Sequence, residues 1–456
     1  MDLKPHIFRQ YDIRGIVGED LDPEVTRQVG KAYGTVLMET LGGKGGTVVV
    51  GQDNRPHSPE LAEGLMQGLQ SAGVEVVSLG TVPTPLVLWA EQRLGTQGGI
   101  QITGSHNPPE YNGIKMTMQG RSFYGERIQG LFTRLLEGRL MEGDGSRADR
   151  EIIPSYVEEI AAGFKLKRPV RLVLDCGNGA GALVGVELLR AIGADVLPLY
   201  CESDGTFPNH HPDPTVDEYL VDMIQMVREE GAEVGIAFDG DADRIGCVDE
   251  NGQVVRGDLL LLLFGLDILE KLGPGQKLVF DVKCSQAVPE AFAQAGGEPI
   301  MWMTGHSHIK EKMKETGAAL GGELSGHICF ADEYIGIDDA LYDACRLADL
   351  LARKEESLSA LAAALPAYVS TPEIRIEVDE ERKWEVVDRA LEHFRKSHEV
   401  IDVDGARILF GDGWGLLRTS NTQPVIVARF EARTEERLKQ IRSEVEGWLQ
   451  TQGVHV

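Results

Sequence analysis

The amino-acid sequence predicts an α/β fold with three similar domains, followed by a C-terminal α+β domain with an antiparallel sheet. The length of 456 residues suggests about three domains, or four small ones. One layout of strand, helix and strand occurs three times, and residues 367–456 follow a different pattern. Strand, helix and strand in this order imply right-handed crossovers on a mixed or largely parallel sheet.

The repeated layout begins with a β-rich run at 47–51, 171–175 and 277–281. Each run continues into a helical pattern that stops at a glycine: Gly73, Gly193 and Gly296. Glycine just past a helix is typical of a left-handed C-cap. A second apolar strand follows, as at 74–79 and 195–200.

A third strand in each unit leads into an unusual polar loop. The three loops are Gly104-Ser-His-Asn-Pro108, Asp239-Gly-Asp-Ala-Asp-Arg244 and Gly321-Gly-Glu-Leu-Ser-Gly-His327. In α/β sheets, ligands bind beyond the strand ends on such loops. Similar domains can also be independent of one another, but from the chemistry of the loops we expect the three to come together around a central cleft.

Domain boundaries are expected in segments rich in turn-forming or charged residues, at 141–148 and 249–257, and at Leu365-Pro366, which closes a helical stretch. They divide the chain into domains 1–147, 148–250, 251–366 and 367–456. In the last domain, strands are predicted at 373–378, 406–410 and 425–430, an amphipathic helix at 385–398, and a closing helix from Thr434. This pattern predicts a small α+β domain with an antiparallel sheet.

The formal net charge of −27 excludes some partners and constrains others. A strongly acidic chain repels nucleic acid and anionic membranes, so neither is an expected partner. An anionic substrate would need a local cluster of Arg, Lys or metal. The six cysteines show no C-x-x-C pair or zinc spacing, which favours reduced thiols in a cytoplasmic protein. The most apolar stretch, 259–266, is too short for a bilayer and predicts a buried helix with Asp258 as N-cap.

The loop at 239–244 carries three carboxylates at alternate positions, Asp239, Asp241 and Asp243. They repel one another unless protons or a cation neutralise them, and hard divalent cations accept such oxygen ligands. A calcium EF-hand would need glycine where Arg244 stands, and a helix before the loop. A solvated acidic turn is the other alternative. Three protein ligands leave room for water and a phosphate oxygen, which suits Mg²⁺.

Ser105 lies in the loop Thr103-Gly-Ser-His-Asn-Pro108, which lacks the G-x-S-x-G motif of hydrolases. Serine is a weak nucleophile and needs activation by a base or a metal. Lys115 follows on the return strand, where it could approach the same site. An ordinary β-turn with exposed polar residues is the alternative.

Two other polar segments are weaker signals. The loop Arg418-Thr-Ser-Asn-Thr422 offers the groups that a terminal phosphate requires, but many loops share this composition. His306 and His308 are more simply read as structural residues. His210 and His211 could suggest a metal site, but adjacent histidines rarely share one ion.

Taken together, the loops resemble those of the α-D-phosphohexomutase superfamily along essentially the whole chain. The segments 103–108, 322–327, 418–422 and Tyr11-Asp-Ile-Arg-Gly15 are most similar to the bacterial phosphomannomutase/phosphoglucomutase branch. Phosphoglucosamine mutases usually carry Ala where Gly104 stands and a Ser-Gly-Thr phosphate loop, whereas this chain has Ser420-Asn421-Thr422. Gln423 replaces the Glu of many relatives, and we expect little effect.

The resemblance implies that Ser105 is phosphorylated and that one phosphate oxygen joins Asp239, Asp241 and Asp243 around one Mg²⁺ per chain. The implied catalytic residues besides Ser105 are Arg14, His106, Lys115 and His327. The implied substrate-binding residues are Tyr11, Arg244, Lys283, His306, Glu323, Ser325, His327, Arg418, Ser420, Asn421, Thr422 and Arg429.

The implied reaction interconverts hexose 1-phosphate and hexose 6-phosphate of mannose or glucose in two phosphoryl transfers. Hexose 1,6-bisphosphate is the expected intermediate and activator, and it must turn around between the transfers. The alternatives are a phosphoglucosamine mutase, a metal-dependent sugar phosphatase, and an anion-binding protein that would not need Ser105. The expected partner is a small phosphosugar, and the expected assembly is a monomer or small homo-oligomer.

Overall fold

The computed structural model describes residues 3–420 and 424–454. The chain divides into two compact units. The first comprises Met1–Gly257 and Ser325–Ala360, and the second comprises Asp258–Leu324 and Leu361–Val456. The first unit contains the first two predicted groups of elements and the second contains the last group, while the elements of the third group are divided between the two units.

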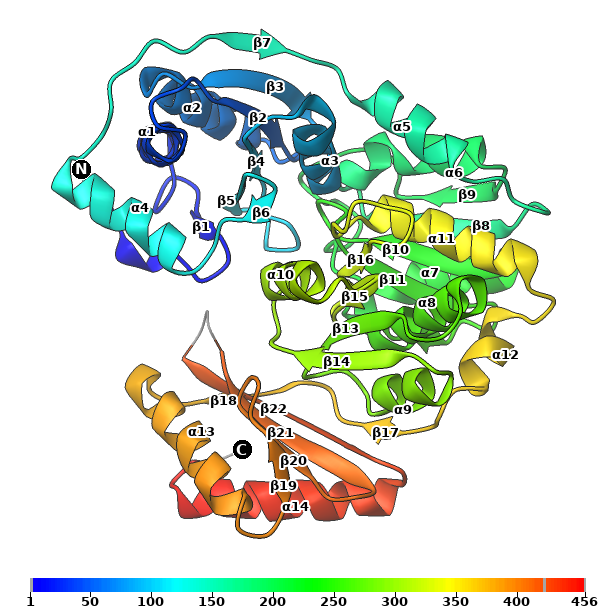
Figure 1. The fold of residues 1–456 in the computed structure, drawn as a ribbon. Helices are drawn as coiled ribbons and strands as arrows, with labels where there is room; N and C mark the ends of the chain where they lie inside the picture. Colours follow the sequence, from blue (N-terminus) through cyan, green and yellow to red (C-terminus); the bar gives the residue numbers. More distant parts are fainter. Residues whose placement is uncertain (1–2, 421–423, 455–456) are drawn as a thin grey trace. The chain divides into compact units, whose positions relative to one another are not determined.

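The first sheet of the first unit is mixed (Figure 1). Its order is β1 (Ile13–Ile16), β5 (Tyr111–Met118), β4 (Gly98–Ile102), β2 (Thr47–Gln52), β3 (Glu75–Thr81) and β7 (Arg147–Asp149), and β6 (Arg121–Ser122) pairs with β5. Strand β2 is parallel to β3 and β4. Strand β5 is antiparallel to β4 and β1, so the chain reverses at the loop that carries Ser105.

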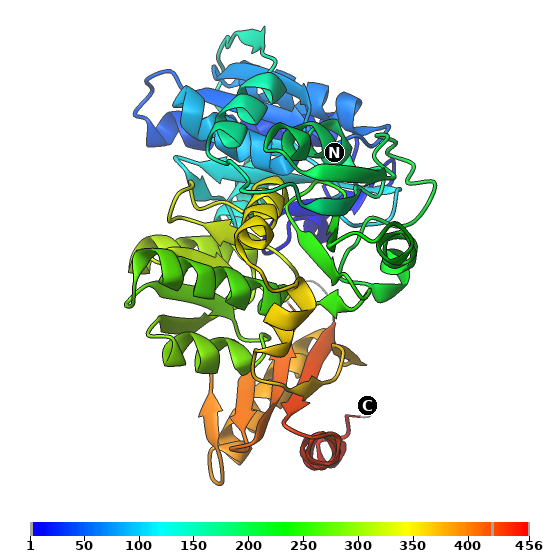
Figure 2. The same ribbon diagram turned by 90° about the vertical axis from the view of Figure 1, so that its right-hand side faces the viewer.

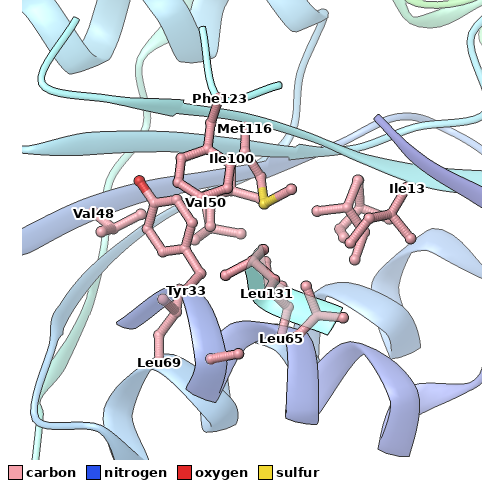
Figure 3. Packing of buried hydrophobic residues seen from close by; sticks show 14 of the residues in the cluster. Ile13, Tyr33, Val48, Val50, Leu65, Leu69, Ile100, Met116, Phe123 and Leu131 are labelled. Carbon is pink, nitrogen blue, oxygen red and sulfur yellow. The ribbon is translucent and has the colours of Figure 1, made fainter. Parts of the chain in front are cut away.

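Alternating side chains of this sheet face different helices. Val48, Val50 and Ile100 join a buried core with Tyr33 and Leu65 (Figure 3). That core is built with the helices α1 (Pro23–Thr40), α2 (Ser58–Ser71) and α4 (Glu126–Glu137). On the opposite face, α3 (Thr84–Leu94) packs on β2 and β4, where the sheet presents two glycines to it. A short 3₁₀ helix, η1 (Pro5–Ile7), precedes β1.

The second sheet of the same unit has the order β12 (Val254–Val255), β11 (Ile245–Asp249), β10 (Val234–Phe238), β8 (Arg171–Asp175) and β9 (Asp195–Leu199). Strand β8 is parallel to β9 and β10, while β11 is antiparallel to β10. The reversal between β10 and β11 is the loop of three aspartates. The helical elements of this part are α5 (Ile153–Ala162), η2 (Ala180–Leu183), α6 (Gly185–Ala191), η3 (Asp217–Leu220) and α7 (Val221–Glu230).

A later segment returns to the first unit with β16 (Ile328–Phe330) and α11 (Ala340–Arg353). Helix α11 contacts α6 and β11. The carboxylate of Asp339 caps α11 by accepting from the backbone N–H groups of Leu341 and Tyr342. It also accepts a hydrogen bond from the Tyr156 hydroxyl at 2.8 Å, which ties the returning segment to α5. Helix α12 (Leu358–Ala363) follows.

The second unit begins with a parallel arrangement in which β13 (Lys277–Asp281) pairs with β14 (Glu298–Trp302) and β15 (Leu320–Gly322). Its helices are α8 (Gly257–Leu272), α9 (Ala287–Gln294) and α10 (His306–Thr316). The buried helix predicted at 259–266 lies in α8. The predicted N-cap is wrong, because Asp258 lies inside the helix and its carboxylate accepts from the backbone N–H of Ser285 at 2.8 Å.

The C-terminal sheet is antiparallel throughout, as predicted. Its strands are β17 (Val369–Ser370), β18 (Ile374–Glu377), β19 (Glu399–Ile401), β20 (Ala406–Leu409), β21 (Gly413–Thr419) and β22 (Val425–Ala432). Helices α13 (Glu380–Phe394) and α14 (Glu435–Thr451) share one apolar core with it. Helix α14, red in Figures 1 and 2, packs along β21 and β22.

The other face of this sheet carries Arg407 and Trp414. The buried Arg407 guanidinium stacks on the Trp414 ring at 3.9 Å and donates hydrogen bonds to the carbonyl oxygens of Val282 and Cys284. These contacts join the antiparallel sheet to the segment after β13, so the two parts of the second unit form one body.

Candidate active site

Ser105 lies in the reversal between β4 and β5 and is only 2% exposed. Its backbone φ is +49°, a left-handed conformation that is uncommon for serine. The backbone N–H of Ser105 donates to the Thr103 hydroxyl at 2.8 Å, and that of Gly104 donates to Asp53 at 2.9 Å. Strained backbone held by its surroundings occurs preferentially at functional sites. The alternative of an exposed β-turn is therefore wrong, because the serine is buried.

The surroundings that hold this loop centre on Arg55, which sequence reasoning missed. Its guanidinium is 1% exposed and donates to four backbone carbonyl oxygens. They belong to Ser105 at 2.8 Å, Asn107 at 2.6 Å, Pro108 at 2.7 Å and Tyr111 at 3.1 Å. The planar fork of an arginine suits such multiple contacts. A signal for Arg55 was its place in the polar stretch directly after β2.

The same guanidinium explains why residue 104 is glycine. A Cβ atom added at Gly104 would lie 2.4 Å from Cζ of Arg55 and 2.8 Å from the Tyr111 carbonyl oxygen. Contacts this short require the neighbours to move. Gly104 and Arg55 therefore form a matched pair beneath the serine.

The aspartate loop follows β10 and turns through Ala242, whose φ is +59°. Asp239, Asp241 and Asp243 are each 0% exposed, and ligand oxygens from the three lie within 4.8 Å of one another. The solvated acidic turn is therefore wrong as an interpretation. The strand before the loop likewise contradicts the EF-hand alternative.

The serine and aspartate loops meet within the first unit. The Ser105 hydroxyl donates a hydrogen bond to Oδ2 of Asp239 at 2.8 Å. Lys115, on β5, donates to Oδ2 of Asp241 at 2.8 Å and to Oδ2 of Asp243 at 2.5 Å. The register of β4 and β5, which pairs Gln101 with Lys115, brings the lysine to this end of the sheet.

The aspartate cluster fits a divalent cation. Within the described residues, Oδ1 of Asp241 and Oδ1 of Asp243 are buried and accept no hydrogen bond. A buried oxygen without a partner is costly, and a hard cation supplies the missing interaction. The donor set is entirely carboxylate oxygen, the kind that Mg²⁺ and Ca²⁺ prefer. The site thus indicates a metal cofactor.

Opposing charges set the ionisation of this cluster. Burial raises the pKa of Asp239 well above its usual range, and the Asp243 and Asp241 charges raise it further. Burial acts the same way on Asp241 and Asp243, but the charge of Lys115, together with hydrogen bonds at Asp241 and the charges of His327 and Arg244 at Asp243, lowers the pKa of both. Burial alone would lower the pKa of Lys115, but the carboxylates of Asp241 and Asp243 raise it. Lys115 is therefore a cation at neutral pH.

His106 lies beside the serine, with Nδ1 3.2 Å from Oγ of Ser105. Burial holds the pKa of His106 well below its usual range, and the charges of Arg244, Arg14 and Lys115 act in the same direction. The imidazole is therefore neutral at pH 7. The ring of His211 hydrogen-bonds to the backbone carbonyl oxygen of His106 through Nε2.

The adjacent histidines at 210 and 211 are held by protein groups. Nε2 of His210 lies 3.0 Å from Asp175, and Nδ1 lies 2.9 Å from the His211 carbonyl oxygen. With His211 bound to His106, both rings connect loops of the first unit. This arrangement favours the structural interpretation over a metal site.

Arg244, the last residue of the aspartate loop, contacts His327. Nε of Arg244 donates to Nε2 of His327 at 2.9 Å, while Nδ1 of His327 lies 3.3 Å from Oδ2 of Asp338. The same nitrogen is 3.7 Å from Oδ1 of Asp243. Asp338 is 1% exposed. It was not predicted from the sequence, although it forms an acidic pair with Asp339 there.

Arg14 and Tyr11 belong to the N-terminal strand region. Arg14 lies on β1, close to the start of β5. A Cβ atom added at Gly113 would lie 3.6 Å from the Cα atom of Arg14. Nε of Arg14 donates to the Asp12 carboxylate at 3.0 Å. Tyr11 is half-buried just before this strand. Ser325 is half-buried in the first unit, on the same returning segment as His327.

The remaining predicted substrate residues belong to the second unit. Glu323 is buried, and its carboxylate accepts from the Gly305 backbone N–H at 2.6 Å, next to His306 at the start of α10. Lys283 donates to Glu373 at 2.7 Å. Burial would lower the pKa of Lys283, but Glu373 and Asp281 raise it.

The predicted phosphate loop follows β21 in this unit. Arg418 pairs with Asp404 at 3.0 Å, and the Ser420 carbonyl oxygen accepts from Lys383 at 2.7 Å. Arg429, on the neighbouring strand β22, lies 3.5 Å from the Ser370 hydroxyl. Asn421 and Thr422 lie outside the described residues.

Comparison with known families identifies the class of this protein. Models of the phosphoglucomutase/phosphomannomutase family match in order: α/β/α domain I at residues 5–138, domain II at 154–252, domain III at 256–368 and the C-terminal domain at 373–447. The chain belongs to this family, within the α-D-phosphohexomutase superfamily. Its architecture is four-domain α/β, and its class is that of enzymes that move a phosphoryl group within a substrate.

Among individual proteins, it is similar to the phosphomannomutase/phosphoglucomutase of Pseudomonas aeruginosa PAO1, at 43% identity over 97% of this chain and 95% of the relative. The phosphoglucomutase of Neisseria gonorrhoeae is 40% identical over 96% of this chain and 95% of the relative. A crystal structure of a phosphoglucomutase/phosphomannomutase family protein from Burkholderia thailandensis matches with a TM-score of 0.92 and 41% identity, covering 98% of each chain. Among the described residues, no helix has the length and apolar content needed to cross a membrane.

Proposed function

We propose that this phosphohexomutase interconverts the 1-phosphates and 6-phosphates of glucose and mannose, with phosphorylated Ser105 as the phosphoryl donor. The observation that carries the proposal is the buried hydrogen bond, 2.8 Å long, between the Ser105 hydroxyl and the aspartate cluster at Asp239. It places the candidate nucleophile against the candidate metal ligands. The names of the relatives support the choice of substrates.

In the first transfer, a sugar hydroxyl oxygen bonds to the phosphorus, and the bond from phosphorus to Oγ of Ser105 breaks. In the second, Oγ of Ser105 bonds to the other phosphorus of the hexose 1,6-bisphosphate, the bond from that phosphorus to the sugar oxygen breaks, and the hexose monophosphate leaves. Lys115 and Arg244, with Arg14, would offset negative charge on the transferring oxygens. Mg²⁺ held by the three aspartates would add electrostatic stabilisation of the same charge when bound.

Proton transfer is assigned to His327, with His106 beside the serine as a neutral hydrogen-bonding group. Asp338 faces Nδ1 of His327, which leaves Nε2 as the nitrogen available to exchange a proton with the sugar hydroxyl. Arg244 lies against that nitrogen in the present structure, so it would have to turn towards the phosphate when substrate binds.

The relatives favour a mutase over a sugar phosphatase. The similar proteins from Pseudomonas aeruginosa and Neisseria gonorrhoeae are named phosphomannomutase/phosphoglucomutase and phosphoglucomutase.

The second unit is assigned to the part of the substrate that does not react. Arg418, Ser420, Asn421 and Thr422 would hold the second phosphate, and Glu323, with Ser325 of the first unit, would bind sugar hydroxyls. The further proposed contacts are Tyr11, Lys283, His306 and Arg429. The buried Glu323 and Lys283 support this assignment, because both are charged groups held in fixed positions.

Several finer features belong to the same proposal. One Mg²⁺ binds per chain, hexose 1,6-bisphosphate serves as activator, and the protein acts in the cytoplasm as a monomer or small homo-oligomer. The domains divide at 147, 250 and 366. The all-oxygen ligand set supports Mg²⁺, and six free thiols support a reducing compartment.

Ser105→Ala tests the proposal. The intact mass of the active wild-type protein should include one phosphate, and the variant should include none. Mutase activity on both phosphosugars should fall to background, while circular dichroism and thermal stability stay close to wild type. Near-normal turnover in the variant would disprove the phosphoserine mechanism.

A further inference from the structure

Two cysteines outside the proposed mechanism lie side by side in the first unit. Cys176 follows β8 directly, and Cys201 comes shortly after the neighbouring parallel strand β9. Their Sγ atoms are 3.2 Å apart. Both are free thiols; Cys176 is buried and Cys201 is partly exposed. Oxidation of the two thiols, with a small approach of the sulfur atoms to about 2.05 Å, would form a disulfide.

The segments that carry these cysteines hold the aspartate loop. Following Cys176, the backbone N–H of Ala180 donates to the Gly240 carbonyl oxygen at 2.9 Å. Gly179 packs so closely on Gly240 that an added Cβ would lie 2.7 Å from that oxygen. Since Gly240 lies between Asp239 and Asp241, the position of this segment bears on the candidate metal ligands.

The same segments also hold the polar stretch that leads to Arg55. The Asn54 amide donates to the carbonyl oxygen of Asn178 at 2.7 Å and to the hydroxyl of Ser203 at 2.9 Å. Asn178 follows Cys176, and Ser203 follows Cys201. A movement of the cysteine segments would therefore be transmitted to the aspartate loop through Gly240 and to the stretch before Arg55 through Asn54.

We propose that Cys176 and Cys201 form a reversible disulfide when the protein meets a peroxide, and that this bond slows phosphoryl transfer by displacing residues 177–180 from the aspartate loop. The displacement rests on the contacts with Gly240 and Asn54. The effect on phosphoryl transfer rests on the proposed function, whereas formation of the disulfide does not.

The chemistry balances with one peroxide. The sulfur of Cys201, the accessible thiol, attacks one peroxide oxygen; the O–O bond breaks, water leaves, and a sulfenic acid remains. The sulfur of Cys176 then displaces the sulfenic hydroxyl as a second water, and the S–S bond forms. Two thiols are oxidised and one peroxide is reduced to two waters. Exchange with an external dithiol restores both thiols.

The charge states agree with these roles. Burial raises the pKa of the Cys176 thiol, while its hydrogen bond with Cys176 lowers the pKa of Cys201. The thiol with the lower pKa provides more thiolate, which is the attacking species.

The test treats the full-length wild-type protein with hydrogen peroxide and measures intact mass, crosslinked peptides and kcat. We expect the loss of two hydrogen atoms, a peptide pair joined through Cys176 and Cys201, and a roughly 10-fold to 100-fold lower kcat, because small misplacements of reacting groups have effects of this size. Dithiothreitol should restore the mass and kcat.

Cys201→Ala should keep full activity in peroxide and form no crosslink. Cys345→Ala, which removes a buried cysteine of α11, should respond like wild type. The proposal is overturned by the absence of the crosslink, by a crosslink that leaves kcat unchanged, or by equal inactivation of Cys201→Ala. Absence of mutase activity in the reduced wild-type protein would instead refute the proposed function, while the mass measurement would still report on the cysteine pair.

Discussion

Nη2 of Arg55 donates a hydrogen bond to the backbone carbonyl oxygen of Ser105 at 2.8 Å. The guanidinium thus binds the main chain of the candidate nucleophile, while the Ser105 side chain donates a hydrogen bond to Asp239. Because φ of Ser105 is +49°, the loop needs such support to keep this conformation. Arg55 is therefore a positioning residue and does not take part in the chemistry.

Arg55→Lys should lower kcat by about 10-fold to 100-fold and change KM much less. A lysine ammonium is compact and cannot reach four carbonyl oxygens arranged around a planar fork. Each buried carbonyl left without a donor costs about 1–3 kcal/mol, so the melting temperature should also fall. Steady-state kinetics and thermal unfolding measure both effects. A variant with wild-type kcat would show that the loop keeps its shape without Arg55.

Gly104→Ala should impair the wild-type protein more than it impairs Arg55→Lys. In the wild type, the new methyl group meets Cζ of Arg55 at 2.4 Å, and that clash disappears when the guanidinium is removed. The contact with the Tyr111 carbonyl oxygen at 2.8 Å remains, so the recovery will be partial. A double-mutant cycle on kcat gives the coupling between the two positions. Strictly additive effects would contradict the matched pair.

Asp241→Asn should raise the Mg²⁺ concentration needed for activity or lower the activity at saturation. The change removes the negative charge of one of the three anionic ligands and replaces one of its two carboxylate oxygens with an amide NH₂ group, which cannot bind a cation. Activity and Mg²⁺ binding by calorimetry provide two readouts. Asp204→Asn, at an exposed position of the same unit, is the control and should behave like wild type. An unchanged Mg²⁺ titration in Asp241→Asn would place the metal elsewhere.

Glu323→Ala should reduce kcat/KM for glucose and mannose phosphates to a similar degree. The two sugars differ only at the second carbon, so a carboxylate that binds the third and fourth hydroxyls would serve both. Loss of hydrogen bonds to a charged group corresponds to roughly 10-fold to 100-fold. Glu323 also accepts from the Gly305 N–H at 2.6 Å, and Glu323→Gln can keep that bond.

Comparison of these two variants separates the two effects of the Glu323 change. A defect shared by the Ala and Gln variants would reflect loss of charge at the sugar, and a defect in the Ala variant alone would reflect loss of the loop. A loss confined to one of the two sugars would show that this residue distinguishes glucose from mannose at the second carbon.

Asp339 should make the first unit less stable as pH rises. Burial raises its pKa to about 6, although the hydroxyls of Tyr334 and Tyr156 act against that shift. Because the folded pKa exceeds the unfolded value of about 3.9, the folded state holds the extra proton, and the stabilisation present at low pH is lost as pH rises through 6.

The difference amounts to at most about 3 kcal/mol between about pH 4 and pH 7. Asp339→Asn cannot ionise, so urea unfolding should show its stability gaining on wild type by up to this amount over the interval. Parallel pH dependence in the two proteins would show that Asp339 does not titrate in this range.

Local patterns in the sequence predicted much of the fold because the repeats are regular. The runs at 47–51, 171–175 and 277–281 are β2, β8 and β13, and the antiparallel C-terminal sheet was also expected. The contact of Lys115 with the aspartate loop could be anticipated because the lysine lies on the strand that returns from the serine loop.

Arg55, Asp338 and the cysteine pair could not be found in this way. Arg55 acts through backbone carbonyl oxygens, which carry no sequence signal, and its targets lie on a loop far along the chain. Asp338 matters because the returning segment places it beside His327. Cys176 and Cys201 meet because β8 and β9 are neighbours in register, which periodicity alone does not reveal.

The interrupted course of the first unit has a consequence for how the protein is made. Its last segment, Ser325–Ala360, carries His327 and α11, but the ribosome synthesises it only after residues 258–324 of the other unit. Chains emerge from the amino end, and domains tend to fold as they emerge. While residues 258–324 are translated, the early part of the first unit therefore remains incomplete, and the surface that α11 will cover remains exposed. A nascent chain stalled before Ser325 would expose that surface and offer chaperones a binding target.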